Sequence, residues 1–121
     1  MPSIAIVGAS SDKTKFGNKA VRAYLKQGWT VFPIHPKEET IEGLKVYRSV
    51  KEIPEPLDRV TLYVAPKIGM GLLEEMKGKV KELFVNPGAE SDELLQKAKQ
   101  LGLNPVFGCV ITDVGESPAA Y

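Results

Sequence analysis

Short apolar runs alternate with amphipathic stretches along this chain. Residues 4–7 are continuously apolar and mostly β-branched, which is typical of a strand buried on both faces of a parallel sheet. Residues 16–27 place apolar side chains at helical spacing, and Gly28 follows where such a helix would end. The chain therefore opens with a predicted strand followed by a predicted helix.

The same alternation continues to residue 107. We expect the later elements in two sets: strands at 30–34, 60–64, 83–85 and 105–107, and helices at 49–53, 66–78 and 91–102. Ser91 is expected to cap the last helix. Residues 38–46 are polar and expected to be irregular, and the tail from Cys109 to Tyr121 gives no clear pattern. Repeated strand–helix units predict an α/β fold, a three-layer, Rossmann-like, doubly wound parallel sheet of five strands.

The composition limits the class of protein. The 121 residues are 43% hydrophobic and 26% charged, so we expect residues 1–121 to form a single globular domain. The net charge of +1 argues against nucleic acid as a partner. No apolar run approaches the roughly 18 residues of a membrane span, and Met1-Pro2-Ser3 begins no signal-peptide pattern. The single cysteine, Cys109, cannot form an internal disulfide, which favours a cytoplasmic location.

The first predicted strand ends in a turn with the features of a phosphate-binding site. Gly8 has no side chain, so the backbone of the Gly8-Ala9-Ser10 turn can approach an anion, and Ser10 offers a hydroxyl. The N-terminus of the helix that follows carries a partial positive charge. Lys13 and Lys15 lie in the same loop, so this loop is expected to hold a diphosphate.

The glycine spacing differs from the common dinucleotide fingerprint. That fingerprint has a third glycine five residues after the first, but residue 13 is lysine and the next glycine is Gly17. An NAD site also has an acid at the end of the second strand, whereas this strand ends in His35-Pro36-Lys37, and Glu38 and Glu39 follow only after the proline turn. A cation there suits the phosphorylated ribose of NADP or coenzyme A.

Five segments occur in a distinctive order over about residues 3–110: Val7-Gly8-Ala9-Ser10, Phe16-Gly17-Asn18, Pro33-Ile34-His35-Pro36-Lys37, Gly43-Leu44-Lys45-Val46-Tyr47 and Asn86-Pro87-Gly88-Ala89. Their order and spacing resemble the small stand-alone CoA-binding proteins, whose fold is similar to the CoA-binding domain of the succinyl-CoA synthetase alpha subunit. The resemblance implies that CoA lies across the C-terminal ends of the strands.

The resemblance also implies a role for each group of site residues. Gly8 and Ser10, in the turn that also contains Ala9, would meet the diphosphate, and Lys15, Phe16 and Gly17 would close the loop. Lys37 would reach the 3′-phosphate or the ribose, beside Pro36 and His35, which replaces the asparagine usual in the family. The adenine or the pantetheine arm would pass Val64, Ala65 and Pro66, and then Asn86, Pro87 and Gly88.

Three functions fit these observations. The first is a protein that binds CoA or an acyl-CoA and has no evident catalytic apparatus, since the sequence shows no convergent acid–base pair and no metal-ligand cluster. The second is an NADP-binding redox or sensing module. The third is an interaction subunit that supplies CoA to a larger enzyme. A homodimer or a complex with a partner enzyme is the expected assembly.

Two residues allow both a structural and a functional interpretation. His35, the only histidine, is interpreted as a ligand contact, with a plain turn residue and a catalytic base as the alternatives. Cys109 is interpreted as a small buried apolar residue. The alternative places its thiol near the CoA thiol, where the two could form a mixed disulfide by exchange.

Overall fold

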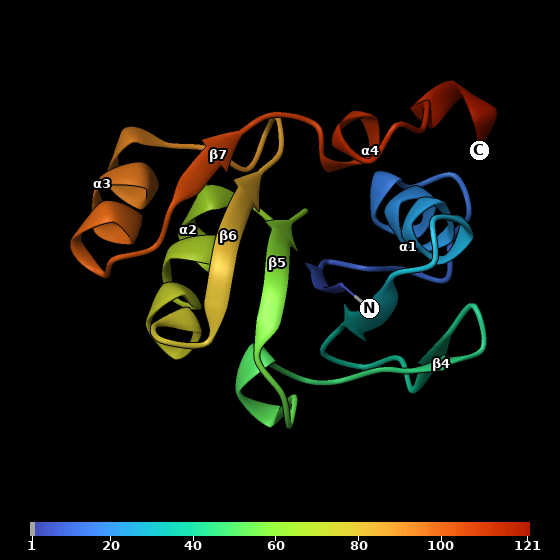
Figure 1. Ribbon diagram of the computed structural model, residues 1–121, viewed down its shortest axis with the longest axis horizontal. Helices are drawn as coiled ribbons and strands as arrows, with labels where there is room; N and C mark the ends of the chain where they lie inside the picture. Colours follow the sequence, from blue (N-terminus) through green and yellow to red (C-terminus); the bar gives the residue numbers. More distant parts are fainter. Residues whose placement is uncertain (1) are drawn as a thin grey trace.

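The computed structural model describes residues 2–121. These residues fold around one five-stranded parallel sheet, which lies at the centre of the structure (Figure 1). Its strands run in the spatial order β2 (Thr30–Ile34), β1 (Ser3–Val7), β5 (Leu57–Leu62), β6 (Val80–Val85) and β7 (Pro105–Phe107). All four neighbouring pairs are parallel. The strand order reverses between β1 and β5, which is where ligands bind in sheets of this type. The predicted α/β class and parallel five-stranded sheet are confirmed.

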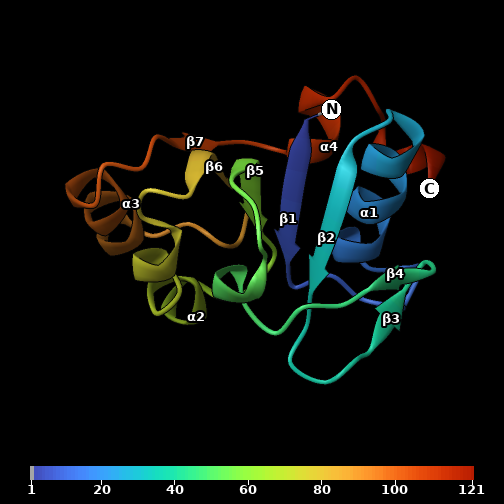
Figure 2. The ribbon, with the colours of Figure 1, turned by 60° about the horizontal axis from the view of Figure 1, so that its bottom comes forward.

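Helices cover both faces of the sheet and make three layers. Figure 2 shows α1 (Phe16–Lys26) on one side, where α4 (Val110–Asp113) and the 3-10 helix η3 (Pro118–Ala120) also pack. The opposite side carries η1 (Val50–Glu52), α2 (Pro66–Met70), η2 (Leu73–Met76) and α3 (Asp92–Gln100). Alternate residues of β1 enter the two hydrophobic cores, Ile4 and Ile6 on the side of α1, and Ala5 and Val7 on the opposite side. This two-sided burial explains the continuous apolar run of β1.

The expectation that residues 38–46 are irregular is wrong. Strands β3 (Thr40–Ile41) and β4 (Leu44–Lys45) form a small antiparallel hairpin there. Its turn residues Glu42 and Gly43 have φ values of 50° and 77°, the left-handed conformation that a tight hairpin turn requires. Ile41 is 1% exposed and anchors the hairpin in the core beside α1.

The helix predicted at 66–78 is broken into two short pieces. Helix α2 ends at Met70, with Gly71 as its C-cap, and the chain resumes as η2. At Gly69, a Cβ atom would lie 3.1 Å from the side chains of both Leu62 and Leu94, so close packing of α2 explains that glycine. Ser91 caps α3 as predicted, because its hydroxyl accepts a hydrogen bond of 3.1 Å from the Leu94 amide.

Element ends differ from the predicted ones elsewhere. Strands β5 and β6 each begin three residues earlier than expected, and β5 ends at Leu62 rather than at Val64. The element predicted at 49–53 is the single 3-10 turn η1, and the unassigned tail forms α4 and η3. Within residues 2–121, no helix is both long and apolar enough to cross a membrane.

Candidate ligand-binding site

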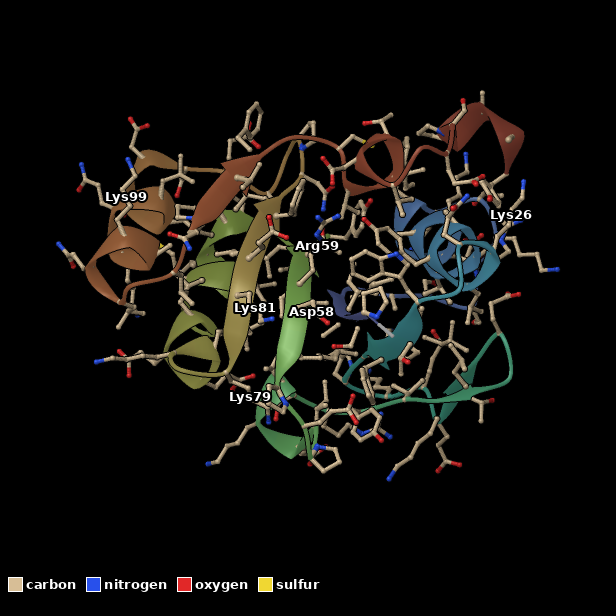
Figure 3. All side chains as sticks on the ribbon, in the orientation of Figure 1. Lys26, Asp58, Arg59, Lys79, Lys81 and Lys99 are labelled. Carbon is tan, nitrogen blue, oxygen red and sulfur yellow. The ribbon has the colours of Figure 1, made fainter. Side chains whose placement is uncertain are left out.

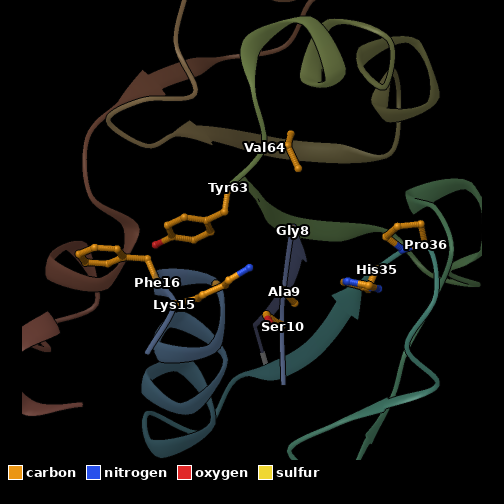
Figure 4. Close-up of a pocket in the computed structure, with 10 residues that line it drawn as sticks. Gly8, Ala9, Ser10, Lys15, Phe16, His35, Pro36, Tyr63 and Val64 are labelled. Carbon is orange, nitrogen blue, oxygen red and sulfur yellow. The ribbon is translucent and has the colours of Figure 1, made fainter. Parts of the chain in front are cut away.

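A cavity of about 350 Å³ opens where β1, β2 and β5 end, at the reversal of the strand order (Figure 4). Its lining consists of Gly8, Ala9, Ser10, Lys15, Phe16, Gly17, His35, Pro36, Tyr63 and Val64. Every one of these residues except Tyr63 was predicted from the sequence. The structure therefore brings the first turn, the start of α1 and the end of β2 together around one space.

Two glycines allow α1 to pack directly on the end of β1. Gly8 has a φ of +87°, and a Cβ atom there would lie 2.6 Å from the carbonyl oxygen of Tyr63. At Gly17 a Cβ atom would collide with the carbonyl oxygen of Gly8. Gly17 therefore provides the close helix–strand packing that the third glycine provides in the common dinucleotide turn, although it comes later in the chain.

The N-terminus of α1 provides a positively charged wall for the cavity. Its N-cap residue, Lys15, makes no capping hydrogen bond through its side chain, and the first turn of α1 contains no acid. Helix α3 differs, because Ser91 caps it and its first turn carries Asp92 and Glu93. The amide groups at the start of α1 and the Lys15 ammonium thus face the same cavity, which favours a bound anion.

The loop between β1 and α1 is held in place by a buried asparagine. Asn18 is fully buried, and its Nδ2 donates to the carbonyl oxygen of Ser10 at 2.8 Å and to Oε2 of Glu42 at 3.0 Å. Nε of Arg22 donates to Oδ1 of Asn18 at 2.7 Å, and Arg22 also donates to the carbonyl oxygen of Lys13 at 3.1 Å. The loop is therefore preorganised around the cavity by bonds to α1 and to the β3–β4 turn.

The turn after β2 is stabilised by His35. Its Nδ1 accepts hydrogen bonds of 3.0 Å from the backbone amides of both Lys37 and Glu38. This is the local side-chain acceptor that an asparagine supplies in such turns. Arg48, which the sequence analysis did not single out, donates to the carbonyl oxygens of His35 at 2.9 Å and of Glu38 at 2.6 Å. His35 therefore has a structural role in this turn as well as a place in the cavity wall.

Glu38 returns toward the loop between β1 and α1 after the proline turn. Its Oε2 accepts a hydrogen bond of 3.1 Å from the Ser11 amide and lies 3.7 Å from Nε2 of His35. Hydrogen bonds from Ser11, and the charges of His35 and Lys15, lower the pKa of Glu38. In the sequence Glu38 comes after the turn at Pro36, but in the fold it lies beside the loop between β1 and α1.

Two more cavities continue along the strand ends. One, of about 160 Å³, is lined by Phe16, Tyr63, Asn86, Pro87 and Cys109. The other, of about 290 Å³, is lined by Leu62, Tyr63, Val64, Ala65, Pro87, Gly88 and Ala89. Tyr63 lines all three cavities, and Phe16 lines the first and the second. Tyr63 was not among the predicted site residues; it was expected inside the strand at 60–64, but β5 ends at Leu62 and Tyr63 directly follows it.

Three predicted site residues lie apart from these cavities. Lys13 and Lys37 are exposed and line none of the three, so their contact with a ligand stays a prediction. Pro66 lines a separate cavity of about 480 Å³ between α2 and α3. Cys109, interpreted from the sequence as buried, is only partly buried.

Asn86 has a structural role in addition to its place in the wall of the second cavity. It is 2% exposed, and its Nδ2 donates to the Leu62 carbonyl oxygen at 2.8 Å and to the Thr61 hydroxyl. Its Oδ1 accepts from the Val110 amide at 3.1 Å. Asn86 therefore lines the second cavity but uses its polar atoms to join β5, β6 and the start of α4. In the described part of the chain, no three His, Cys, Asp or Glu side chains gather into a metal site.

The chain belongs to a family of CoA-binding domains, because the family model described as "CoA binding domain" matches residues 2–114. It is 30% identical over 131 residues to the alpha subunit of acetate–CoA ligase [ADP-forming] I of Pyrococcus furiosus, covering 91% of this chain and 28% of that subunit. It is also 26% identical to the uncharacterised protein YneT of Bacillus subtilis, with 89% of this chain and 81% of that protein covered. The resemblance found in the sequence is therefore confirmed.

Solved structures share the fold. A conserved hypothetical protein from Pyrococcus furiosus superimposes with a TM-score of 0.86 at 37% identity, covering 93% of this chain and 99% of that one. The chain is thus a Rossmann-like CoA-binding domain related to the CoA-binding part of ADP-forming CoA ligases. It spans less than a third of the length of the curated ligases that it matches.

Proposed function

We propose that this protein binds coenzyme A, or an acyl-CoA, across the carboxyl ends of β1, β2, β5 and β6. The observation that carries the proposal is the basic, uncapped N-terminus of α1, which opens on the cavity beside Gly8, Ala9 and Ser10. A diphosphate in this cavity would meet free amide groups and the Lys15 ammonium. Membership of the CoA-binding domain family supports CoA as the molecule that carries this diphosphate.

The shape of the site also supports a long ligand. Shared lining residues place the three cavities in a row along the strand ends. With the diphosphate at Gly8, the adenosine fits toward His35 and Val64, and the pantetheine arm fits past Tyr63 toward Pro87. A row of small spaces fits a long, flexible arm better than it fits a compact metabolite.

We propose further that the chain has no catalytic centre of its own in this site. The titratable side chains that line the three cavities are Lys15, His35, Tyr63 and Cys109. Within residues 2–121, none of these four side chains is hydrogen-bonded to another. General acid–base catalysis needs a positioned partner, so binding is the better supported role.

A second candidate function is to supply CoA to a partner enzyme. Similarity to a ligase alpha subunit favours it, because that relative is named as one part of an ADP-forming acetate–CoA ligase. In this case CoA would be bound here and the chemistry would be performed elsewhere. Co-purification of a larger protein from the native source, released by excess CoA, would support this role, and purification without a partner would count against it.

Isothermal titration with CoA, dephospho-CoA and NADP tests the leading proposal. We expect CoA to bind at least about tenfold tighter than NADP, a difference of about 1.4 kcal/mol. Equal affinity for the two would favour the NADP-binding module instead. Equal affinity for CoA and dephospho-CoA would remove the role predicted for Lys37.

A pair of lysine variants locates the diphosphate. Lys15→Met removes the ammonium at the start of α1 and is expected to weaken CoA binding about tenfold or more, because hydrogen bonds to charged groups contribute about 1.5–3 kcal/mol. Lys51→Met removes an exposed charge on η1, away from the cavities, and serves as the matched control. Equal losses in both variants would show only a general charge effect.

A further inference from the structure

The hydroxyl of Tyr63 is buried and has no hydrogen-bond partner among residues 2–121. Most buried polar groups are paired, because leaving one unpaired costs folding free energy. Burial, followed by the influence of Cys109 and Tyr24, raises the pKa of Tyr63 well above its ordinary value. The phenol therefore keeps its proton at neutral pH and is available as a donor.

Phe16 and Tyr63 form the wall between the first two cavities, since both residues line both spaces. Figure 4 shows the Tyr63 hydroxyl directed toward the Phe16 side chain. Phe16 is the first residue of α1 and is 52% exposed, so a rotamer change of its ring meets little resistance. Such a change would uncover the Tyr63 hydroxyl and join the second cavity to the diphosphate site.

The second cavity suits a small, uncharged group. Phe16, Pro87 and Cys109 give it apolar walls, and the polar atoms of Asn86 are already bonded to other residues. Its volume of about 160 Å³ holds roughly five groups of the size of a water molecule, at about 30 Å³ each. No charged side chain lines it, so a carboxylate would lose its hydration there without compensation.

We propose that this second cavity holds the thioester end of an acyl-CoA with a short, uncharged acyl group, and that the Tyr63 hydroxyl donates a hydrogen bond to the thioester carbonyl. The proposal rests on the proposed CoA-binding function and names the form of the ligand that the site prefers. Free CoA ends in a thiol, which is a weak acceptor and would leave the hydroxyl poorly satisfied. Succinyl-CoA would place a carboxylate in the apolar cavity.

Titration of the full chain with three ligands tests this preference. We expect acetyl-CoA to bind roughly fivefold tighter than CoA, which is the range of one net hydrogen bond. Succinyl-CoA is expected to bind more weakly than acetyl-CoA. In Tyr63→Phe the ring remains and the donor is lost, so the ratio of the acetyl-CoA and CoA affinities, both measured in that variant, should fall below about twofold.

A matched variant and a stability measurement separate this role from a structural one. Tyr47→Phe removes a phenolic hydroxyl outside the three cavities and should keep the preference for acetyl-CoA. Thermal unfolding of Tyr63→Phe should show no loss of stability, since the buried hydroxyl has no partner to lose. Cys109→Leu fills the cavity from another wall and should also abolish the acetyl-CoA advantage.

The outcomes distinguish this inference from the function on which it rests. If neither CoA nor acetyl-CoA binds, the proposed function fails and this inference fails with it. If CoA binds but acetyl-CoA binds no tighter, the inference alone is overturned. An acetyl-CoA advantage that survives in Tyr63→Phe or in Cys109→Leu would also overturn it, because the ligand would then use another contact.

Discussion

The side chain of Asn86 accepts a hydrogen bond of 3.1 Å from the backbone amide of Val110. The same side chain donates to the Leu62 carbonyl oxygen at 2.8 Å, so one buried amide joins the ends of β5 and β6 to the start of α4. Cys109 directly precedes Val110, and this bond therefore fixes one wall of the second cavity. Asn86, which was predicted from the sequence to lie along the ligand path, thus positions another residue that lines the second cavity.

Replacing Asn86 by leucine should destabilise the protein by about 2–4 kcal/mol. The change keeps the size of the side chain but leaves the buried Val110 amide and the Leu62 carbonyl without their partner. Denaturant unfolding measures the effect, and Asn104→Leu, at an exposed position before β7, is the control with little expected loss. Equal stability of the two variants would contradict the positioning role of Asn86.

Arg59 on β5 is expected to contribute more than a typical surface ion pair (Figure 3). It is 9% exposed, and Nη1 lies 2.8 Å from Oδ2 of Asp113, while its guanidinium carbon lies 4.3 Å from the centre of the Phe84 ring. Arg59→Met should cost about 1–3 kcal/mol, less than a fully buried pair, because the side chain of Asp113 is 45% exposed.

The control for Arg59 lies in the same sheet. Lys81 on β6 pairs with Asp58 at 3.4 Å, but the Lys81 side chain is 78% exposed and screened by water. Lys81→Met should therefore change the free energy of unfolding by less than about 1 kcal/mol. If the two variants lost the same stability in denaturant unfolding, the buried position of Arg59 would not be the cause of its contribution.

Strands β1, β2, β5 and β6 were predictable because each contains a local apolar run that the sheet buries. The Gly8 turn and the Ser91 cap were also predictable, since each depends on a few neighbouring residues. The β3–β4 hairpin was missed because its turn places Glu42, a residue other than glycine, at a φ of 50°. Local patterns gave no sign of that conformation.

The unpredicted parts of the site depend on contacts between residues far apart in the sequence. Glu38 reaches Ser11, and Arg48 bonds to the turn at His35, only after β1 and β2 have paired. The row of cavities at Tyr63 depends on where β5 ends, which propensity alone left uncertain by two residues. The sequence therefore predicted the residue types of the site better than the bonds between them.

Gly17→Ala should disrupt the site by moving α1 away from β1. A Cβ atom at Gly17 would collide with the Gly8 carbonyl oxygen, which is rigid backbone, so the helix start must shift. We expect a loss of about 1–3 kcal/mol in the free energy of unfolding, as for other overpacked positions, together with weaker CoA binding. Gly108→Ala is the control, because a Cβ atom there meets nothing within 4 Å. A fully stable Gly17→Ala variant would contradict this packing.

The contact between Glu38 and Ser11 should be lost on acidification. Hydrogen bonds from Ser11 hold the pKa of Glu38 below its ordinary value of 4.5 in the folded protein. A carboxylate with a lowered pKa stabilises the folded state above its unfolded pKa, and this contribution disappears as the pH falls through the folded pKa. The contact is therefore complete at neutral pH and breaks only below about pH 4.5.

Nuclear magnetic resonance can follow this contact from both partners. The side-chain carboxyl carbon of Glu38 should titrate below pH 4.5, and the Ser11 amide shift should change over the same range. Glu38→Gln should remove that change at Ser11, whereas Glu39→Gln, at the exposed neighbouring position, should leave it. If Glu38 titrated at or above pH 4.5, or if the Ser11 titration were unchanged in Glu38→Gln, the carboxylate would not be holding the loop between β1 and α1 against the end of β2.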